Sequence, residues 1–338
     1  KLQEAKETSQ QTIEKRHLPD TEKEFSEFLF QWLEYIRPRI KESSYVKYAN
    51  LIELHIDREI GAVKLGSLNT AVIDEFINTL LEGTEEIAPL SAKTVTDILG
   101  VVRNVIRYIN GRFQRVECDL SQITIKKEES RMRILSREEQ EQLIRYLREY
   151  PSPMNCGIFL TLFTGLRIGE LCALTWEDIH LREKEVFIRK TMQRIQNKRP
   201  EKPRQEWGSR TRIIITAPKS SKSIRHIPIP EGVAEVLGEY QRHGNEYFLT
   251  GKENRYVEPR TLQYHFKKVL KKSSIEEANY HALRHTFATR CIELGFDIKS
   301  LSEILGHASV NITLNRYVHP SMELKRDNME KLSGLIAE

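Results

Sequence analysis

The chain has 338 residues, of which 39% are hydrophobic and 30% charged, as expected for a globular protein of about two domains. Its apolar stretches are too short for a membrane helix and its N-terminus is too polar for a signal peptide, so we expect a cytoplasmic protein. Its four widely separated cysteines predict neither disulfides nor a zinc site, and the net charge of +5 is only a weak indication of a polyanionic partner.

The N-terminal part of the chain is predicted to be helical. Residues 1–18 are polar and lack an apolar period, which indicates a tail or linker. Residues 19–122 are predicted to form a small all-helical domain, and the charged run at 123–132 is predicted to be an interdomain linker. The four amphipathic helices of this domain are predicted at Phe25–Ile36, Ser44–Ile60, about Thr70 to Gly83, and Ser91 to Gly111.

A second domain is predicted from residue 133 to residue 320. Its first helix begins with a capping box, in which Ser136 is the N-cap and Glu139 stands three residues on. A second helix is predicted from about Met154 through Phe163, with a break in the helical pattern at Gly165. From about residue 232 onward the pattern is again mostly helical.

Between these helical parts, three short apolar or alternating runs predict strands at Glu185–Met192, Arg212–Thr216 and Lys222–Ile229. We interpret the first two as a long hairpin around a polar span. From Arg189 to Arg225 the chain has twelve Lys or Arg residues against two Asp or Glu, so its positive charge is concentrated there. Such a stretch is either a solvated loop or a surface laid along phosphates. In the second case the DNA contacts would be Arg189, Lys190, Arg194, Lys198, Arg199, Arg210, Arg212, Lys222 and Arg225.

Four short motifs carry residues suited to phosphodiester chemistry. Transfer of a phosphodiester to a side-chain hydroxyl needs a nucleophile, several cations around the transition state and a proton donor for the leaving oxygen. Any one of the motifs alone would more often hold a surface arginine, a structural histidine or a core aromatic residue. In chain order they are G-L-R-x-G-E around Arg167, H-x-L-R-H-T-F-A-T from His281, L-G-H ending at His307, and N-R-Y-V-H around Tyr317.

In this order the motifs resemble the tyrosine recombinase family, and more closely the integrases of Gram-positive phages and conjugative transposons. The resemblance covers about residues 20 to 325. His307 and Tyr317 stand ten positions apart, one more than in several relatives.

The resemblance assigns a role to each matching residue. Arg167 and Arg284 would hold the nonbridging phosphate oxygens, and Tyr317 would attack the phosphorus atom. His281 would assist proton transfer, His307 would donate a hydrogen bond to the phosphate, and Glu170 would orient the site. The run around Pro218-Lys219 resembles the family's lysine turn, so Lys219 would protonate the leaving 5′ oxygen, with Lys222 as the alternative.

The implied fold is α+β, with a small all-helical core-binding domain and a mostly helical catalytic domain that contains a small antiparallel sheet. Such a protein would close as a clamp on double-stranded DNA at specific recombination sites, in the bacterial cytoplasm. It would act as a homotetramer through a Holliday junction, without metal or cofactor, to integrate or excise a mobile element. Residues 321–338 would form a tail docking on a neighbouring protomer, and accessory DNA-bending or excision factors would be further partners.

Two other functions remain open at this point. A type IB topoisomerase-like strand transferase shares the same chemistry, although the small helical bundle and the L-G-H motif argue against it. A catalytically inactive DNA-binding regulator would not be expected to keep the full set of arginine, lysine, histidine and tyrosine residues. Recombination of two marked sites and trapping of a covalent adduct, respectively, distinguish these functions from a recombinase.

Overall fold

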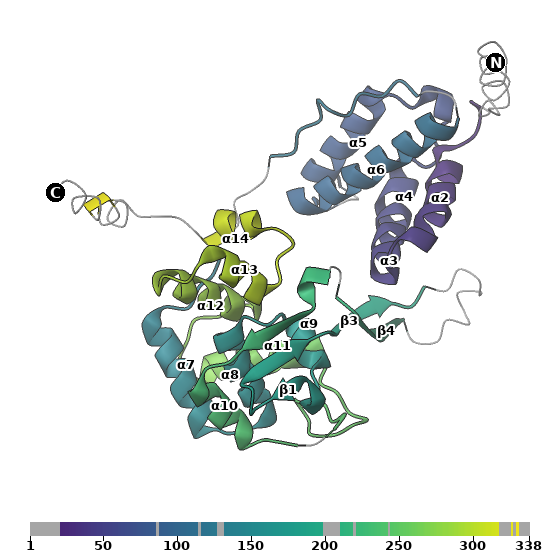
Figure 1. The fold of residues 1–338 in the computed structure, drawn as a ribbon. Coiled ribbons are helices and arrows are strands. Elements are labelled where there is room, and N and C mark those ends of the chain that lie inside the picture. The colour runs from purple at the N-terminus through teal and green to yellow at the C-terminus, as the bar shows by residue number, and fades with distance from the viewer. Residues whose placement is uncertain are drawn as a thin grey trace, which may run out of the picture. The chain divides into compact units, whose positions relative to one another are not determined.

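The computed structural model describes residues 21–85, 88–113, 116–126, 132–198, 210–218, 221–242 and 244–317, together with Arg326, Met329 and Glu330. The chain divides into two compact units, shown in Figure 1. The first unit comprises residues 1–130 and 196–208, and the second comprises residues 131–195 and 209–338. Within the described ranges, no helix is both long and apolar enough to span a membrane.

The first unit is a helical bundle, and its helices confirm the sequence-based expectation closely. A π-helical segment, Ile52–Ile56, joins the second helix to the third, so the run predicted from Ser44 to Ile60 is continuous and begins two residues earlier. The Asn69 and Ser91 side chains accept hydrogen bonds from backbone N–H groups in the first turn of the helices that follow them. The α-helices are α2 (Phe25–Ile36), α3 (Glu42–Leu51), α4 (Asp57–Ile60), α5 (Thr70–Glu82) and α6 (Ala92–Arg112).

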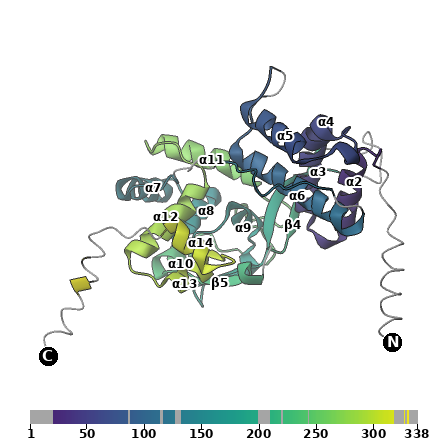
Figure 2. The same ribbon diagram turned by 90° about the horizontal axis from the view of Figure 1, so that it is seen from above.

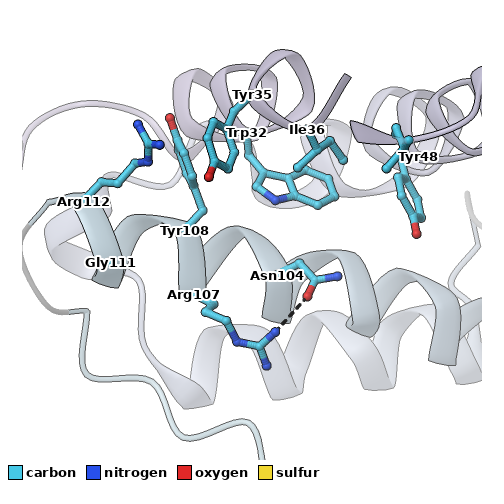
Figure 3. Close-up of a pocket in the computed structure, with 10 residues that line it drawn as sticks. Trp32, Tyr35, Ile36, Tyr48, Asn104, Arg107, Tyr108, Gly111 and Arg112 are labelled. Carbon is cyan, nitrogen blue, oxygen red and sulfur yellow. Dashed lines mark hydrogen bonds between the residues drawn. The ribbon is translucent and has the colours of Figure 1, made fainter. Parts of the chain in front are cut away.

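A hollow of about 500 Å³ is lined by residues of α2, α3 and α6. Figure 3 shows the Tyr35 and Tyr108 rings side by side, with Arg112 next to Tyr108. The Arg112 guanidinium lies 4.2 Å from the centroid of the Tyr35 ring, a cation–π distance. On the same wall, Arg107 donates to Asn104 at 3.2 Å. The hollow therefore combines aromatic rings with arginine side chains.

The second unit is mostly helical and has one large core and one small core cluster. The capping box predicted at Ser136 and Glu139 is present, with both reciprocal hydrogen bonds. The helix that follows it, α7, packs on α8, which is buried on nearly all sides. The last three helices contact one another and lie side by side in both ribbon views (Figure 1 and Figure 2). The helices are α7 (Arg137–Glu149), α8 (Pro153–Thr164), α9 (Ile168–Ala173), α10 (Glu231–Gly238), α11 (Pro259–Lys272), α12 (His281–Glu293), α13 (Ile298–Leu305) and α14 (Val310–Tyr317).

The strands of the second unit form two small sheets. The three-stranded sheet is antiparallel in the order β1, β2, β5, and Val186 of β2 lies opposite Ile227 of β5 in the core. The other sheet pairs β3 with β4. With these sheets the α+β expectation is confirmed. The strands are β1 (Ile179–His180), β2 (Glu185–Ile188), β3 (Thr191–Gln196), β4 (Thr211–Thr216) and β5 (Arg225–Pro228).

The predicted long hairpin is confirmed only in part, because β3 and β4 pair with each other but β2 belongs to the other sheet. The run expected as one strand breaks at Arg189 and Lys190. Its first four residues form β2, which pairs with β1 and β5, and its last two residues begin β3, which pairs with β4. Both basic side chains bind the carboxylate of Glu177, and the Nζ atom of Lys190 lies 3.2 Å from its oxygen. Arg189 also binds Asp178. These ion pairs accompany the break between the two strands. The last strand also starts later than expected, because Lys222 lies in a short 3₁₀ turn before it.

Candidate active site

Arg284 is almost fully buried in the second unit. It projects from α12, is only 1% exposed, and donates to the backbone carbonyls of Gly165 and Leu305, both at 2.7 Å. These carbonyls lie at the C-terminal ends of α8 and α13, where helix carbonyls lack intrahelical partners and carry a partial negative charge. Arg284 thus satisfies two helix ends while placing a cation beneath the site.

Two glycines allow the chain to turn at these helix ends. Gly165 and Gly306 have φ values of +65° and +64°, in the left-handed region that disfavours side chains. A Cβ atom at Gly165 would lie 2.6 Å from the Phe287 ring, and one at Gly306 would lie 3.0 Å from Arg225 Nη1. Arg167 follows Gly165 by two positions, and His307 directly follows Gly306. The two turns therefore bring Arg167 and His307 into the same region.

Glu170 joins two further arginines in a buried cluster. It is 3% exposed and accepts from Arg167 Nη1 at 2.8 Å and from both terminal nitrogens of Arg225 at 3.0 and 3.1 Å. Burial raises the pKa of this carboxyl group, but the charges and hydrogen bonds of Arg225 and Arg167 outweigh burial and hold its pKa below the usual value. Glu170 is therefore placed to fix Arg167, which also donates to the Gly306 carbonyl at 3.0 Å.

Arg225 lies inside this cluster, although its place in the basic stretch predicts a DNA contact. Its side chain is 6% exposed and binds Glu170, the Ser223 carbonyl and the Ile304 carbonyl. A guanidinium group engaged in this way suits positioning of the site better than a surface contact with phosphate. We therefore propose a positioning role for Arg225.

Tyr317 projects into the same region from α14. It is 7% exposed, and its hydroxyl oxygen lies 2.8 Å from Nδ1 of His285. The Tyr317 ring is nearly parallel to the His307 ring, with 6.5 Å between the centroids, and His307 Nδ1 is 2.8 Å from Thr313 Oγ1. Burial raises the pKa of the Tyr317 hydroxyl, and the positive charges of Arg284 and Arg316 oppose this effect. The phenol is therefore protonated at neutral pH.

The buried histidines near Tyr317 are neutral. Burial and the neighbouring arginines lower the pKa of His285 to about 4 and that of His307 to about 3. The arginines that act on both groups are Arg284 and Arg316. A neutral imidazole both donates and accepts a hydrogen bond, so these side chains have a basic nitrogen at neutral pH.

The structure brings most of the predicted catalytic residues together in the second unit. Arg167, Glu170, Arg284, His307 and Tyr317 are linked by the contacts described above. His281 lies on the same helix as Arg284, and its exposed side chain meets His285 edge to face, with 4.5 Å between ring centroids. Lys219 lies outside the described residues.

The predicted DNA contacts occupy varied positions. Several are engaged in ion pairs: Arg189 and Lys190 with Glu177, Arg194 with Glu258, and Lys198 with Glu53. Lys222 is exposed and donates to the Ala308 carbonyl at 3.2 Å. Arg210 is exposed and Arg212 is half-buried, whereas Arg199 lies outside the described residues. DNA contact by these side chains stays a prediction.

His285 and the buried position of Arg225 were missed by the sequence analysis. His285 is visible in the motif H-x-L-R-H, but its partner Tyr317 stands 32 positions later, and no local pattern relates the two. Arg225 is separated from Glu170 by 55 positions and was obscured by the basic stretch around it. In the described residues, no group of three or more His, Cys, Asp or Glu side chains is arranged to hold a metal ion.

Glu170→Gln is expected to lower the free energy of unfolding by about 3–5 kcal/mol, because it leaves the buried charge of Arg225 without its counterion. Urea denaturation followed by circular dichroism measures this change. Glu277→Gln is the control, since Glu277 binds a basic residue, Lys267, at the surface, where such pairs contribute about 0–1 kcal/mol. Equal losses in the two variants would contradict the assigned role of Glu170.

The buried histidines predict loss of stability in acid. The pKa values of His285 and His307 in the folded chain lie below the usual value of 6.5, so as the pH falls the unfolded chain takes up protons at these groups before the folded chain does. Their stabilising contribution is complete above about pH 6.5 and is lost as the pH falls toward 4 and then 3. Urea denaturation at about pH 7.5 and about pH 5 should show this loss, and His307→Gln should reduce it. An unchanged pH dependence in that variant would argue against a neutral, buried His307.

Comparison with known proteins places this site in a family. Residues 133–323 match the phage integrase family, and residues 24–81 match the phage integrase N-terminal SAM-like domain. A tyrosine recombinase XerC-like protein of Caldanaerobacter subterraneus is 26% identical over 336 residues, which cover 91% of this chain and 82% of that protein. The ICEBs1 integrase of Bacillus subtilis is 23% identical over 52% of this chain and 48% of its own length.

A solved structure agrees in fold. The Tn1549 transposon integrase, in complex with transposon right end DNA, is similar with a TM-score of 0.71 at 21% identity, over 92% of this chain and 99% of that chain. The family match covers more than half of the 338 residues and includes Arg167, Arg284 and Tyr317. The chain therefore belongs to the phage integrase family of tyrosine recombinases.

Proposed function

We propose that this chain is a site-specific DNA recombinase that cleaves and rejoins DNA strands through a 3′-phosphotyrosine intermediate on Tyr317, to integrate or excise a mobile element. The observation that carries the proposal is the position of the Tyr317 hydroxyl group. It is buried in its own chain's cluster of arginines and histidines, next to Arg284 and His285. Family membership supports the same reaction.

The cations of the cluster suit a phosphate in the transition state. Arg284 is held by two carbonyls and Arg167 by Glu170, so neither guanidinium group has to be ordered when charge develops on the phosphate oxygens. Donors fixed in a region of low dielectric stabilise developing charge more strongly than mobile donors in water. His307, held by Thr313, would add a hydrogen bond to the phosphate, and His281 would assist proton transfer.

In the proposed cleavage step the Tyr317 oxygen forms a bond to phosphorus, and the bond from phosphorus to the 5′ oxygen breaks. The leaving 5′ oxygen takes a proton from Lys219, and the 3′ phosphate stays on the tyrosine. Attack by the 5′ hydroxyl group of another strand reverses these steps and releases the enzyme. The phosphodiester energy is conserved in the intermediate, so the reaction needs no nucleotide cofactor.

Double-stranded DNA is the proposed partner of both units. The Tn1549 integrase to which the chain is similar was solved with DNA. We propose that the first unit is the core-DNA-binding domain, and the arginine and tyrosine side chains around its hollow are suited to phosphate and sugar contacts. We further propose that the chain acts as a homotetramer through a Holliday junction, with accessory factors, in the bacterial cytoplasm. The tail at 321–338 would dock on a neighbouring protomer. Most of that tail lies outside the described residues.

Covalent capture tests the proposed function and works whether or not the recombination site has been identified. The protein is incubated with sheared DNA of its source genome, denatured, and recovered with any strand attached to it. Sequencing the strands locates the cleavage site, and mass spectrometry of the digested protein locates the attached nucleotide. We expect a 3′ phosphate on Tyr317 at a recurring sequence. Attachment to a different residue, or no adduct above the background of Tyr317→Phe, would contradict the proposal.

A further inference from the structure

The hydroxyl group of Tyr317 has a hydrogen-bond partner, His285, to which no role has been given so far. Nδ1 of His285 lies 2.8 Å from the hydroxyl oxygen, and both side chains are buried, with 8% and 7% of their surfaces exposed. We propose that His285 is the base that accepts the phenolic proton of Tyr317 during DNA cleavage and returns it during religation. This inference rests on the proposed function, because it concerns the same nucleophile.

The charge states of the two groups are compatible with a hydrogen bond from Tyr317 to His285. Burial raises the pKa of Tyr317, so its oxygen carries a proton, whereas burial and the charges of Arg316 and Arg284 keep His285 neutral by lowering its pKa. In the proposed arrangement the phenol is the donor, and the unprotonated Nδ1 of the neutral imidazole accepts. The tautomer of His285 then has its hydrogen on Nε2. The attacking oxygen therefore already points its proton at a basic nitrogen.

The neighbouring side chains are less suited to this role. His307 lies with its ring parallel to that of Tyr317, at 6.5 Å between centroids, and its Nδ1 is engaged with Thr313. His281 contacts the edge of the His285 ring and not the tyrosine hydroxyl group in the described contacts. Arg284 and Arg316 are cations that favour the phenolate but have no site for its proton. Among these described side chains, His285 thus has a basic nitrogen within hydrogen-bonding distance of the Tyr317 hydroxyl oxygen.

The proton transfer balances the cleavage step. As the bond between the Tyr317 oxygen and phosphorus forms, the O–H bond breaks and its proton passes to Nδ1 of His285. The bond to the 5′ oxygen breaks, and that oxygen takes its proton from the separate acid. A phosphate held by Arg167 and Arg284 would offset their positive charges, which favours a protonated His285 at that moment. In religation the departing tyrosine oxygen takes the proton back.

His285→Gln tests the role, because glutamine can accept the hydrogen bond but cannot take the proton at neutral pH. We expect covalent adduct formation on a nicked suicide duplex carrying the captured cleavage sequence to slow by about 100- to 10,000-fold. DNA affinity in a gel shift should stay close to that of the parent protein. His226→Gln is the matched control, since His226 is exposed on β5 and pairs with Glu185 away from the cluster, and it should cleave normally. Normal cleavage by His285→Gln would overturn the proposal.

A second measurement separates a base from a residue that only orients the tyrosine. Trifluorotyrosine incorporated at position 317 has a more acidic phenol, whose deprotonation depends less on a base. It should restore cleavage to the His285→Gln protein, and failure to restore it would show that the lost function was orientation. If His285→Gln does not bind DNA, His285→Asn replaces it in both measurements.

The two proposals fail in different ways. Normal adduct formation by Tyr317→Phe would remove the proposed function itself. Loss of the adduct in Tyr317→Phe together with normal cleavage by His285→Gln would leave the recombinase intact and remove only the role of His285.

Discussion

Tyr317→Phe is expected to abolish the covalent complex with DNA while leaving DNA affinity nearly unchanged. The substitution deletes the attacking oxygen but keeps the ring, which packs in a small core cluster with Ala288, Cys291 and Leu301. It also removes the partner of the buried His285 Nδ1, and an unsatisfied buried polar group costs about 1–3 kcal/mol of stability. We therefore expect a lower melting temperature together with normal binding.

A nicked suicide duplex carrying the captured cleavage sequence measures the adduct, and a gel shift measures binding. Tyr264→Phe is the control, because Tyr264 is 56% exposed on α11 and lies outside the described cluster. That variant should form the adduct at the parent rate. A normal adduct yield with Tyr317→Phe would mean that another residue is the nucleophile.

Lys219→Ala is expected to slow cleavage by about 100- to 10,000-fold, the contribution of a positioned proton donor, with little change in DNA affinity. The role is proposed from the family's lysine turn, which the sequence places directly after β4. A substrate with sulfur in place of the bridging 5′ oxygen has a leaving group that needs no proton. This substrate should restore cleavage to Lys219→Ala.

Lys222→Ala is the matched control three residues along the chain. Lys222 is exposed in a 3₁₀ turn and donates to the Ala308 carbonyl, so its loss should at most weaken binding and lower the salt dependence by about one counterion. The sulfur substrate should not help this variant. Rescue of Lys222→Ala together with no rescue of Lys219→Ala would show that the acid is Lys222.

The helices were the most predictable part of the fold. The stripe in Phe25–Ile36 and the cap at Ser136 act within one or two turns, and local patterns of this kind are present in the sequence itself. The pairing of strands was less predictable, because it depends on partners far along the chain. The break at Arg189, for example, accompanies ion pairs to Glu177 and Asp178, eleven or twelve positions earlier.

The site was predictable through its motifs and not through its geometry. Four spaced motifs identified Arg167, Arg284 and Tyr317 as a set, but no periodicity indicates that Arg284 is almost fully buried. Its buried guanidinium group donates to backbone carbonyls that lie 119 and 21 positions away along the sequence. The partnership of His285 with Tyr317 likewise depends on how α12 and α14 pack, which a pattern of residue types does not contain.

The contacts of Arg167, Arg225 and Arg284 have a consequence for protein synthesis. Arg167 donates to a carbonyl 139 positions away, Arg225 to one 79 positions away, and Arg284 to one 119 positions away. Contacts between such distant positions form late, since the intervening chain must first be made and folded. The nucleophile follows all of these residues in the sequence. In the proposed function, a partly translated chain that ends before Tyr317 would therefore have no nucleophile and could not cut DNA.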